Sequence, residues 1–285
     1  MQRVARLSSN GSRWHAPSHL RSTLALLPRG PLDLVVQLAL LAAAYWAWRH
    51  ARGAVDGGIG ASFSHARDLV SAERSLGLLI EPGIQSWAVD AGWPAEVARW
   101  GYANLHFKGS CLMLMILYFR YRGSFGFVRN AVFAAMAISV LGYALFPTAP
   151  PRFLPELGLD PSSRVTGNDP RVAAPGDPLF NPFAAVPSMH VGLAIILAWS
   201  LAMLVKPILV RSLLFVYPLL MTYLVIASGN HFWLDAVFGL ATAAPAVGVA
   251  TVLARFNPDW SFAPMRRAPP AKEPEPQPEP EAAPA

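Results

Sequence analysis

The sequence has few charged residues and a single cysteine. Charged side chains make up 14% of its 285 residues, against roughly 25% in a typical soluble domain, while hydrophobic side chains make up 54%. Cys111 lies in an apolar run, which excludes a disulfide framework and a cysteine-based zinc site. The net charge is +6, but the basic residues flank apolar segments, which is typical of membrane topology signals. We therefore expect an integral membrane protein with no nucleic-acid partner.

Six apolar runs approach the length of a helical membrane span, which is about 20 residues. They cover residues 32–48, 101–119, 131–146, 190–205, 208–227 and 234–254. We predict an all-α fold, a polytopic membrane helix bundle of about six transmembrane helices, in one membrane domain at residues 32–255. The first run can also be read as a signal peptide cleaved at residues 42–44. The long basic stretch before it and the spans after it favour an uncleaved first span.

Four segments lie outside the predicted spans. Residues 1–31 hold five arginines and no acidic residue, and we expect a basic cytoplasmic tail there. The segment between the first two runs has apolar residues at partly helical spacing and is expected at the membrane interface. Residues 147–187 contain ten prolines, which predicts a structured or lid-like loop. Residues 256–285 become rich in Pro, Glu and Ala, which predicts a disordered tail without a catalytic role.

The short loops indicate which side of the membrane each segment occupies. Residues 120–130 contain Arg120, Arg122 and Arg129 and no acidic residue, whereas residues 228–233 contain no Lys or Arg. Cytoplasmic loops carry an excess of Lys and Arg, so the first loop is expected inside and the second outside. In this multi-pass protein of the cell membrane, the N-terminus and C-terminus are then cytoplasmic, and the proline-rich loop is external.

Two helix starts on the predicted outer side carry polar residues that a lipid-facing span does not need. Pro187 and Ser188 precede His190 at the start of the fourth run. Proline suits a first helical turn, serine can cap it, and the free amides there can bind an anion. His231 and Asp235 stand four positions apart at the start of the sixth run and share one helix face. The carboxylate can hold one imidazole nitrogen as N–H and leave the other free to act as a nucleophile.

Each candidate also has a plain structural interpretation. A single histidine at a helix end, such as His190, is commonly an interfacial residue. Ionisable residues within spans are costly and usually face the bundle interior, which favours a function for the histidine and aspartate of the sixth run. Arg152 follows a proline run and is either a phosphate clamp or a side chain that reaches lipid headgroups. His106 and Lys108 are either interface anchors or part of a site wall, and the first interpretation is favoured.

As a set, these motifs resemble the type-2 phosphatidic acid phosphatase superfamily over about residues 32–255. Proline-serine-x-histidine, here ending at His190, is similar to the second signature of that superfamily, and histidine-x-x-x-aspartate, here His231 and Asp235, to the third. The Pro-Pro-Arg sequence, the Glu-Arg-Ser-Leu-Gly segment at Glu73 and the Gly-Asn-His form of the last motif resemble the branch that includes inositolphosphorylceramide synthases.

The resemblance implies a double displacement on a phosphoester, without a metal or other cofactor. His231 matches the nucleophile that forms a phosphohistidine, Asp235 its orienting carboxylate, and His190 the acid that protonates the leaving group. The phosphate-binding candidates are Arg152, Ser188 and Asn230. Preorganised donors of this kind stabilise the charge on phosphoryl oxygens. The implied substrate is a membrane lipid phosphate, with an alcohol such as inositol or diacylglycerol as acceptor, and the branch favours transfer of a headgroup such as inositol phosphate.

Two cations of the superfamily pattern are missing. The first signature usually has a lysine seven positions before its arginine and a proline after it, and here Leu145 and Phe153 stand there. The third signature usually has serine-arginine before its histidine, and here Leu224 and Val225 take those positions. Either the site holds a phosphodiester, which carries less charge than a monoester, or other groups substitute. The candidate substitutes are Lys108, Arg164, Arg171 and the amide of Asn230.

Rival functions stay open at this point. Water in place of an alcohol as acceptor gives a lipid phosphate phosphatase acting on phosphatidic acid or a polyprenyl phosphate. A zinc hydrolase would use His190, His231 and Asp235 as metal ligands, although no additional carboxylate or base stands out near the motifs. A transporter or scaffold would use the histidine and aspartate as a proton relay or a structural pair, but the chain has no internal repeat and both motifs lie at span ends. Nothing in the sequence indicates an oligomeric state.

Overall fold

The computed structural model describes residues 30–55, 57–159 and 181–256, and within them it is all-α. The α-helices are α2 (Pro31–Ala54), α3 (Ile59–Ser75), α4 (Glu81–Ala91), α5 (Trp93–Asn104), α6 (Ser110–Arg120), α7 (Arg122–Leu145), α9 (Met189–Ala202), α10 (Ile208–Ala227) and α11 (Trp233–Phe256). A π-helical turn, η1 (Leu105–Gly109), joins α5 to α6, and two 3-10 turns, η2 (Pro151–Phe153) and η3 (Pro155–Leu157), follow α7. The predicted all-α membrane bundle is confirmed. Both predicted tails and the middle of the proline-rich loop lie outside the described residues.

Four helices in the described ranges are long and apolar enough to cross a membrane: α2, α7, α10 and α11. The fourth predicted span, at residues 190–205, is instead the shorter apolar helix α9, which ends at Ala202. Pro207 follows five residues after that end, and a proline disfavours helical geometry in the residue before it, so the helix could not have continued through Lys206. The second predicted span, at residues 101–119, is helical throughout and passes from the end of α5 through the π-helical turn η1 into α6.

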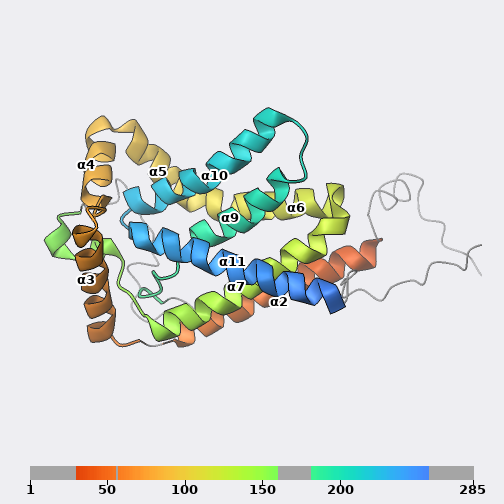
Figure 1. The fold of residues 1–285 in the computed structure, drawn as a ribbon, viewed down its shortest axis with the longest axis horizontal. Helices are drawn as coiled ribbons and strands as arrows, with labels where there is room; N and C mark the ends of the chain where they lie inside the picture. The colour runs from red at the N-terminus through yellow and green to blue at the C-terminus, as the bar shows by residue number, and fades with distance from the viewer. Residues whose placement is uncertain (1–29, 56, 160–180, 257–285) are drawn as a thin grey trace, which may run out of the picture.

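Figure 1 shows α2, α7, α9 and α11 running along one direction, with α3 and α4 lying across it at one end. The 3-10 turns η2 and η3 and the connection between α10 and α11 are at that same end, whereas α2 begins and α11 ends at the opposite end. The segment predicted for the membrane interface therefore forms two helices that cross the end of the bundle. Helices with a lipid-facing side that lie across the spans suit the membrane interface.

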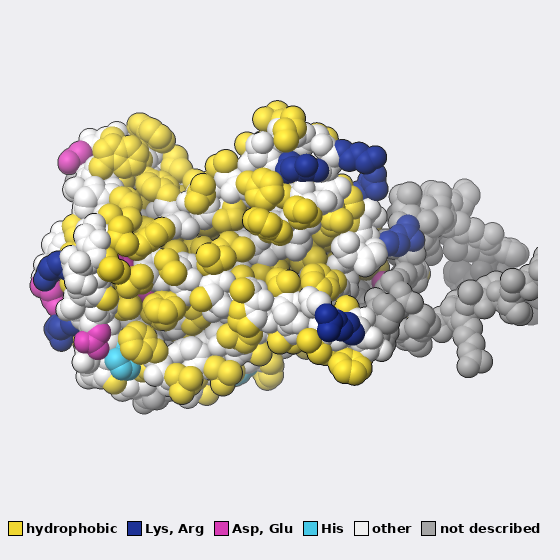
Figure 2. Space-filling view, viewed as in Figure 1, with side chains coloured by type: hydrophobic (Ala, Val, Ile, Leu, Met, Phe, Trp, Pro, Cys, Tyr) yellow, Lys and Arg dark blue, Asp and Glu magenta, His cyan; other side chains and the backbone are white. Residues whose placement is uncertain are grey.

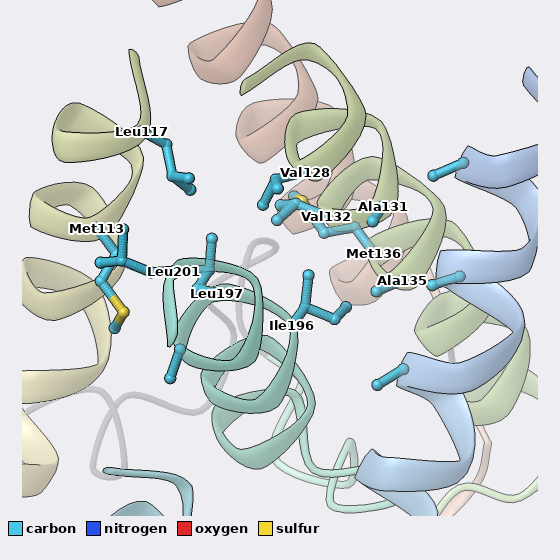
Figure 3. Packing of buried hydrophobic residues seen from close by; sticks show 14 of the residues in the cluster. Met113, Leu117, Val128, Ala131, Val132, Ala135, Met136, Ile196, Leu197 and Leu201 are labelled. Carbon is cyan, nitrogen blue, oxygen red and sulfur yellow. The ribbon is translucent and has the colours of Figure 1, made fainter. Parts of the chain in front are cut away.

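The core of the bundle forms where α9 lies between α6 and α7 (Figure 3). Ile196, Leu197 and Leu201 of α9 are buried there against the apolar side chains of both neighbours. The contact between α7 and α11 is built largely from alanines, among them Ala135 and Ala246, which are both fully buried. Small side chains let two helix backbones approach closely, which is how helices commonly associate in membranes.

Hydrophobic side chains also cover the outside of the bundle. Figure 2 shows them over the middle of the visible face, with Lys and Arg gathered toward one end and acidic and basic side chains at the other. On α10, Ile208, Leu209 and Leu219 are each about 70% exposed, from 69% to 71%. A soluble protein rarely exposes so large an apolar surface, so this belt identifies the surface that contacts lipid.

A buried polar network connects α2 to α6 and α7. The Asp33 carboxylate accepts hydrogen bonds from Gln37 at 3.1 Å and from the Tyr118 hydroxyl at 3.0 Å. Arg129 hydrogen-bonds to Gln37 and Asn130 and is fully buried. The sequence interpretation counted Arg129 among the cytoplasmic loop cations, and that assignment is wrong, because α7 begins at Arg122 and carries Arg129 into the bundle. Charges inside a bundle are costly unless they are paired in this way.

Candidate active site

His231 and Asp235 form a hydrogen-bonded pair at the start of α11. The Nδ1 atom of His231 lies 3.1 Å from Oδ2 of Asp235, and the same oxygen accepts the backbone N–H of Phe232 at 2.9 Å. His231 is 5% exposed and Asp235 is fully buried. A carboxylate at Nδ1 holds the ring proton there and leaves the Nε2 lone pair free. The structure therefore places the two side chains in the contact that their spacing predicts.

His190 faces this pair from the first turn of α9. The ring centroids of His190 and His231 lie 5.4 Å apart with planes at 65°. The ring of Tyr102 is stacked on His190 at 4.9 Å, and the ring of His106 lies 4.2 Å from it. His106 belongs to η1, and π-helical turns are frequent at functional sites. The structure thus places His106 in the wall of the site, against the favoured interpretation as an interface anchor.

Arg152 lies in η2 and is held against the loop that precedes His231. Its backbone N–H donates to the carbonyl of Gly229 at 3.0 Å, and its guanidinium donates to Oδ1 of Asn230. Gly229 has a φ of +64°, and a Cβ there would lie 3.3 Å from the Cβ of Arg152, so the contact favours glycine. Arg152 and Asn230 are half-buried, and their contact lies directly before the buried His231 in the chain.

Ser188 is the N-cap residue of α9, but its hydroxyl makes no capping hydrogen bond, so the predicted cap is wrong. Its Oγ atom is buried and meets no hydrogen-bond partner in the part of the chain that the structure describes. The backbone N–H of Ser188 donates to the carbonyl of Asp235 at 3.1 Å. The backbone N–H groups of residues 189–191 lie in the first turn of α9, where no carbonyl of the same helix can accept their hydrogen bonds. The capacity of this helix start to bind an anion therefore resides in those amides and the hydroxyl.

The structure also bears on the substitutes considered for the missing cations. The backbone N–H of Asn230 donates to a carbonyl of α10 at 3.1 Å, and its side-chain amide donates to Oγ of Ser228 at 2.8 Å. Lys108 is exposed and donates to Asn104 at 2.6 Å, which fits its interpretation as an anchor. Arg164 and Arg171 lie outside the described residues.

Arg52 is a cation near the site that sequence reasoning missed. It lies in the last turn of α2, and its charge acts on His190. Its guanidinium donates to the carbonyl of Asn181 at 3.0 Å and lies 6.0 Å from the ring centroid of Tyr143. The sequence offers one signal, a basic residue just after the first apolar run, and that signal does not identify the groups it contacts.

Glu73 and Glu81 are two further neighbours of the site to which sequence reasoning gave no role. Both are fully buried. Oε1 of Glu81 accepts the backbone N–H of Trp233 at 2.6 Å, and Oε1 of Glu73 accepts that of Leu234 at 2.8 Å. Burial raises the pKa of Glu73 to about 8 and also raises the pKa of Glu81, since desolvation disfavours the charged carboxylate. The sequence gives no signal that singles them out, because other charged residues, such as Asp68 on α3 and Asp90 on α4, lie on the same helices.

Two glycines allow the close approach of α9 and α11 that brings the histidines together. A Cβ on Gly239 would lie 2.6 Å from the carbonyl oxygen of Ser188, and a Cβ on Gly192 would lie 3.1 Å from that of Gly239. Both contacts are with backbone atoms, which cannot rotate away. The distance between His190 and His231 therefore depends on two residues without side chains, Gly192 one turn into α9 and Gly239 nearly two turns into α11.

We expect Gly239→Ala to lower lipid turnover at least about tenfold and to destabilise the protein by about 1–3 kcal/mol, because overpacking forces the two helices apart. Gly248→Ala is the matched control, since it lies on the same helix and a Cβ there meets nothing within 4 Å. Turnover and thermal unfolding in detergent measure the two effects. Equal behaviour of the two variants would show that the glycine contact does not set the site geometry.

The described ranges contain no arrangement of side chains that fits a zinc hydrolase. No group of three or more His, Cys, Asp or Glu side chains is arranged there to hold a metal ion. Asp235 instead directs Oδ2 toward two N–H donors, which is the geometry of an orienting carboxylate.

The sequence model of the PAP2 superfamily matches residues 67–249, a range that includes α9, α10, the two histidines and Asp235. The chain therefore belongs to the PAP2 superfamily, and the superfamily part of the predicted resemblance is confirmed. Membership supports a function of the lipid phosphatase or phosphotransferase type. Comparison with curated proteins and with solved structures returned no match.

Proposed function

We propose that this protein transfers a phospho-headgroup, such as inositol phosphate, between membrane lipids through a phosphohistidine at His231. The observation that carries the proposal is the buried His231 ring with a carboxylate at Nδ1 and the His190 ring 5.4 Å away. Superfamily membership supports the class of reaction. The choice of headgroup rests on the resemblance of the motifs to the inositolphosphorylceramide synthase branch.

In the first step, Nε2 of His231 attacks the phosphorus of the lipid phosphoester. The N–P bond forms, the bond from phosphorus to the lipid alcohol breaks, and protonated His190 gives its proton to the departing oxygen. The His231 ring becomes positively charged, and the Asp235 carboxylate stabilises that charge. The lipid alcohol, diacylglycerol in a glycerophospholipid, then leaves.

In the second step, an acceptor hydroxyl gives its proton to His190 and its oxygen attacks phosphorus. The N–P bond breaks, and His231 returns to its starting state. A lipid alcohol such as diacylglycerol as acceptor yields a phospholipid, whereas water or free inositol as acceptor yields a water-soluble phosphorylated headgroup. Protons and bonds balance over the two steps without a metal ion or other cofactor.

The phosphoryl oxygens are bound by Arg152, by the Ser188 hydroxyl with the first amides of α9, and by the Asn230 side chain. Arg52 adds positive charge on the His190 side. A phosphodiester carries a single negative charge, and this set of donors suits it without the lysine and second arginine of the usual superfamily signatures. Donors that are held in place before the reaction stabilise the transition state most effectively. The missing cations therefore favour a diester donor.

The site faces the outside of the cell membrane in this proposal. The α6–α7 connection, with Arg120 and Arg122 beside it, lies at the end of the bundle opposite α3 and α4 (Figure 1). An excess of basic residues marks the cytoplasmic end. The α10–α11 connection, which carries His231, is at the other end. The N-terminus and C-terminus are then both cytoplasmic.

The alternative function is a lipid phosphate phosphatase that uses the same intermediate and water as acceptor. The half-buried His190, Arg152 and Asn230 give solvent a route to the phosphohistidine unless an acceptor fills it. The test is an assay in liposomes with phosphatidylinositol, phosphatidic acid or a polyprenyl phosphate as donor, with and without a diacylglycerol whose acyl chains differ from those of the donor, or with inositol, whose product is water-soluble. His231→Ala serves as the blank, and a parallel arm contains a chelator.

We expect a new phospholipid that requires both donor and acceptor, at a rate the chelator leaves unchanged. Free phosphate from the monoesters without acceptor would instead identify a phosphatase. A rate lost on chelation and restored by zinc would overturn the metal-independent mechanism.

A further inference from the structure

Three consecutive backbone amides at the start of α11 each bind a different carboxylate. The N–H of Phe232 donates to Asp235 at 2.9 Å, that of Trp233 to Glu81 at 2.6 Å and that of Leu234 to Glu73 at 2.8 Å. These amides follow directly after His231. The backbone that carries the nucleophile candidate is thus held by carboxylates from three helices.

Such amides have no acceptor within their own helix and are usually capped by a neighbouring side chain or by water. Here two of the three caps come from α4 and α3, which are 152 and 161 residues away in the sequence. Both glutamates are fully buried, so water does not compete for these hydrogen bonds. The two helices that lie across the end of the bundle are therefore bonded directly to the first turn of the helix that carries the site.

The second oxygen of each glutamate indicates how two buried carboxyl groups coexist. Neither Oε2 atom meets an N–H or O–H donor in the described part of the chain. Burial raises the pKa of both carboxyl groups, and the charge of Glu81 raises the pKa of Glu73 further, which favours a proton on one of the two. Together they then carry one negative charge, beside the third carboxylate of Asp235.

We propose that Glu73 and Glu81 are positioning residues that align His231 with His190 by fixing the first turn of α11. The proposal rests on the proposed role of His231 as nucleophile. With the Trp233 and Leu234 amides held, the turn cannot tilt away from α9, and the two rings keep their separation. A displacement of about 1 Å at a reacting group can cost about 10²-fold in rate. Loss of either carboxylate acceptor should therefore lower the rate of the chemical step and leave the affinity for the lipid unchanged.

Alanine variants test this directly. In Glu73→Ala and Glu81→Ala, we expect kcat to fall about 10-fold to 100-fold while KM stays within about twofold, because neither side chain is placed among the phosphate-binding groups. Glu96→Ala is the control, since Glu96 is an exposed glutamate paired with Arg99 on α5. A rise in KM alone, or an unchanged kcat, would overturn the positioning role.

Conservative variants separate positioning from folding. Glutamine keeps an oxygen for the α11 amide and offers an N–H to the other carboxylate, so Glu73→Gln and Glu81→Gln should keep at least about half of the wild-type kcat. Aspartate keeps the charge but falls short by one methylene, so Glu73→Asp should lose kcat like the alanine variant. Full activity of the aspartate variant together with loss of activity in the glutamine variants would contradict the proposal. Activity would then depend on the negative charge and not on the length of side chain needed to reach the α11 amides.

Hydrogen–deuterium exchange distinguishes this proposal from the proposed function. The amides of Trp233 and Leu234 should exchange slowly in the wild type and in the glutamine variants, and at least about tenfold faster in the alanine variants. A wild-type protein without turnover of any lipid would defeat the proposed function, whereas fast exchange in the wild type would defeat the positioning contacts themselves.

Discussion

Replacement of His231 with alanine should lower the rate of lipid turnover by a factor of about 10⁴ or more. Removing one member of a set of catalytic residues that act together has an effect of this size. No other imidazole in the described residues has a carboxylate at Nδ1 within hydrogen-bond distance. His190 and the phosphate-binding groups stay in place in this variant, so lipid binding should survive. Equilibrium binding of the lipid and turnover, measured on the same preparation, separate the two effects.

His50→Ala is the matched control for this variant. His50 is exposed on α2, where its ring contacts Trp46 and not the site. It should turn over lipid at the wild-type rate. Turnover by His231→Ala within about tenfold of this control would remove His231 from the mechanism.

Replacement of Asp235 with asparagine should lower kcat about 10²-fold to 10⁴-fold, which is the range that follows from losing an orienting carboxylate. Asparagine has the same shape, and its oxygen can accept from His231 and Phe232 as Oδ2 does. The loss therefore comes from the missing negative charge opposite the imidazole, which becomes positive when its other nitrogen attacks phosphorus. An asparagine that instead turned its amide toward the ring would also favour the wrong tautomer.

The stability of Asp235→Asn should not fall with its activity. Oδ1 of Asp235 is buried and meets no hydrogen-bond donor in the described residues, and a neutral amide is less costly to bury than a carboxylate. We expect a thermal midpoint equal to or above that of the wild type. Asp90→Asn, at an exposed position on α4, is the control. Parallel loss of stability and activity would indicate a structural role for Asp235 and not a catalytic one.

The parts of the site that could be predicted are those that depend on local sequence. The four-residue spacing of His231 and Asp235 places both side chains on one face of any helix that begins there, whatever surrounds it. Proline and serine before His190 mark a helix start in the same way, although the serine hydroxyl turned out not to cap it. The apolar runs likewise predict the long helices, since a membrane span requires continuous hydrophobic length.

The parts that could not be predicted depend on contacts between distant segments. His106 contacts His190 because a π-helical turn interrupts the second apolar run, and polar residues inside such a run do not reveal which way they face. The hydrogen bonds of Glu73 and Glu81 span most of the chain. Arg129 looked like a cytoplasmic loop residue because other arginines lie close to it in the sequence. Its hydrogen-bond partner Gln37 lies far away in the sequence, on the first span.

The central claim is the covalent phosphohistidine, and the direct measurement is to trap it. Purified protein would be mixed with a phospholipid that carries radioactive phosphorus in its headgroup, denatured in alkali and digested, and the labelled peptide would be identified by mass spectrometry. We predict an acid-labile adduct on His231 that disappears when acceptor alcohol is added and is absent from His231→Ala. Turnover without a label on His231, or a label on His190 in its place, would contradict the account.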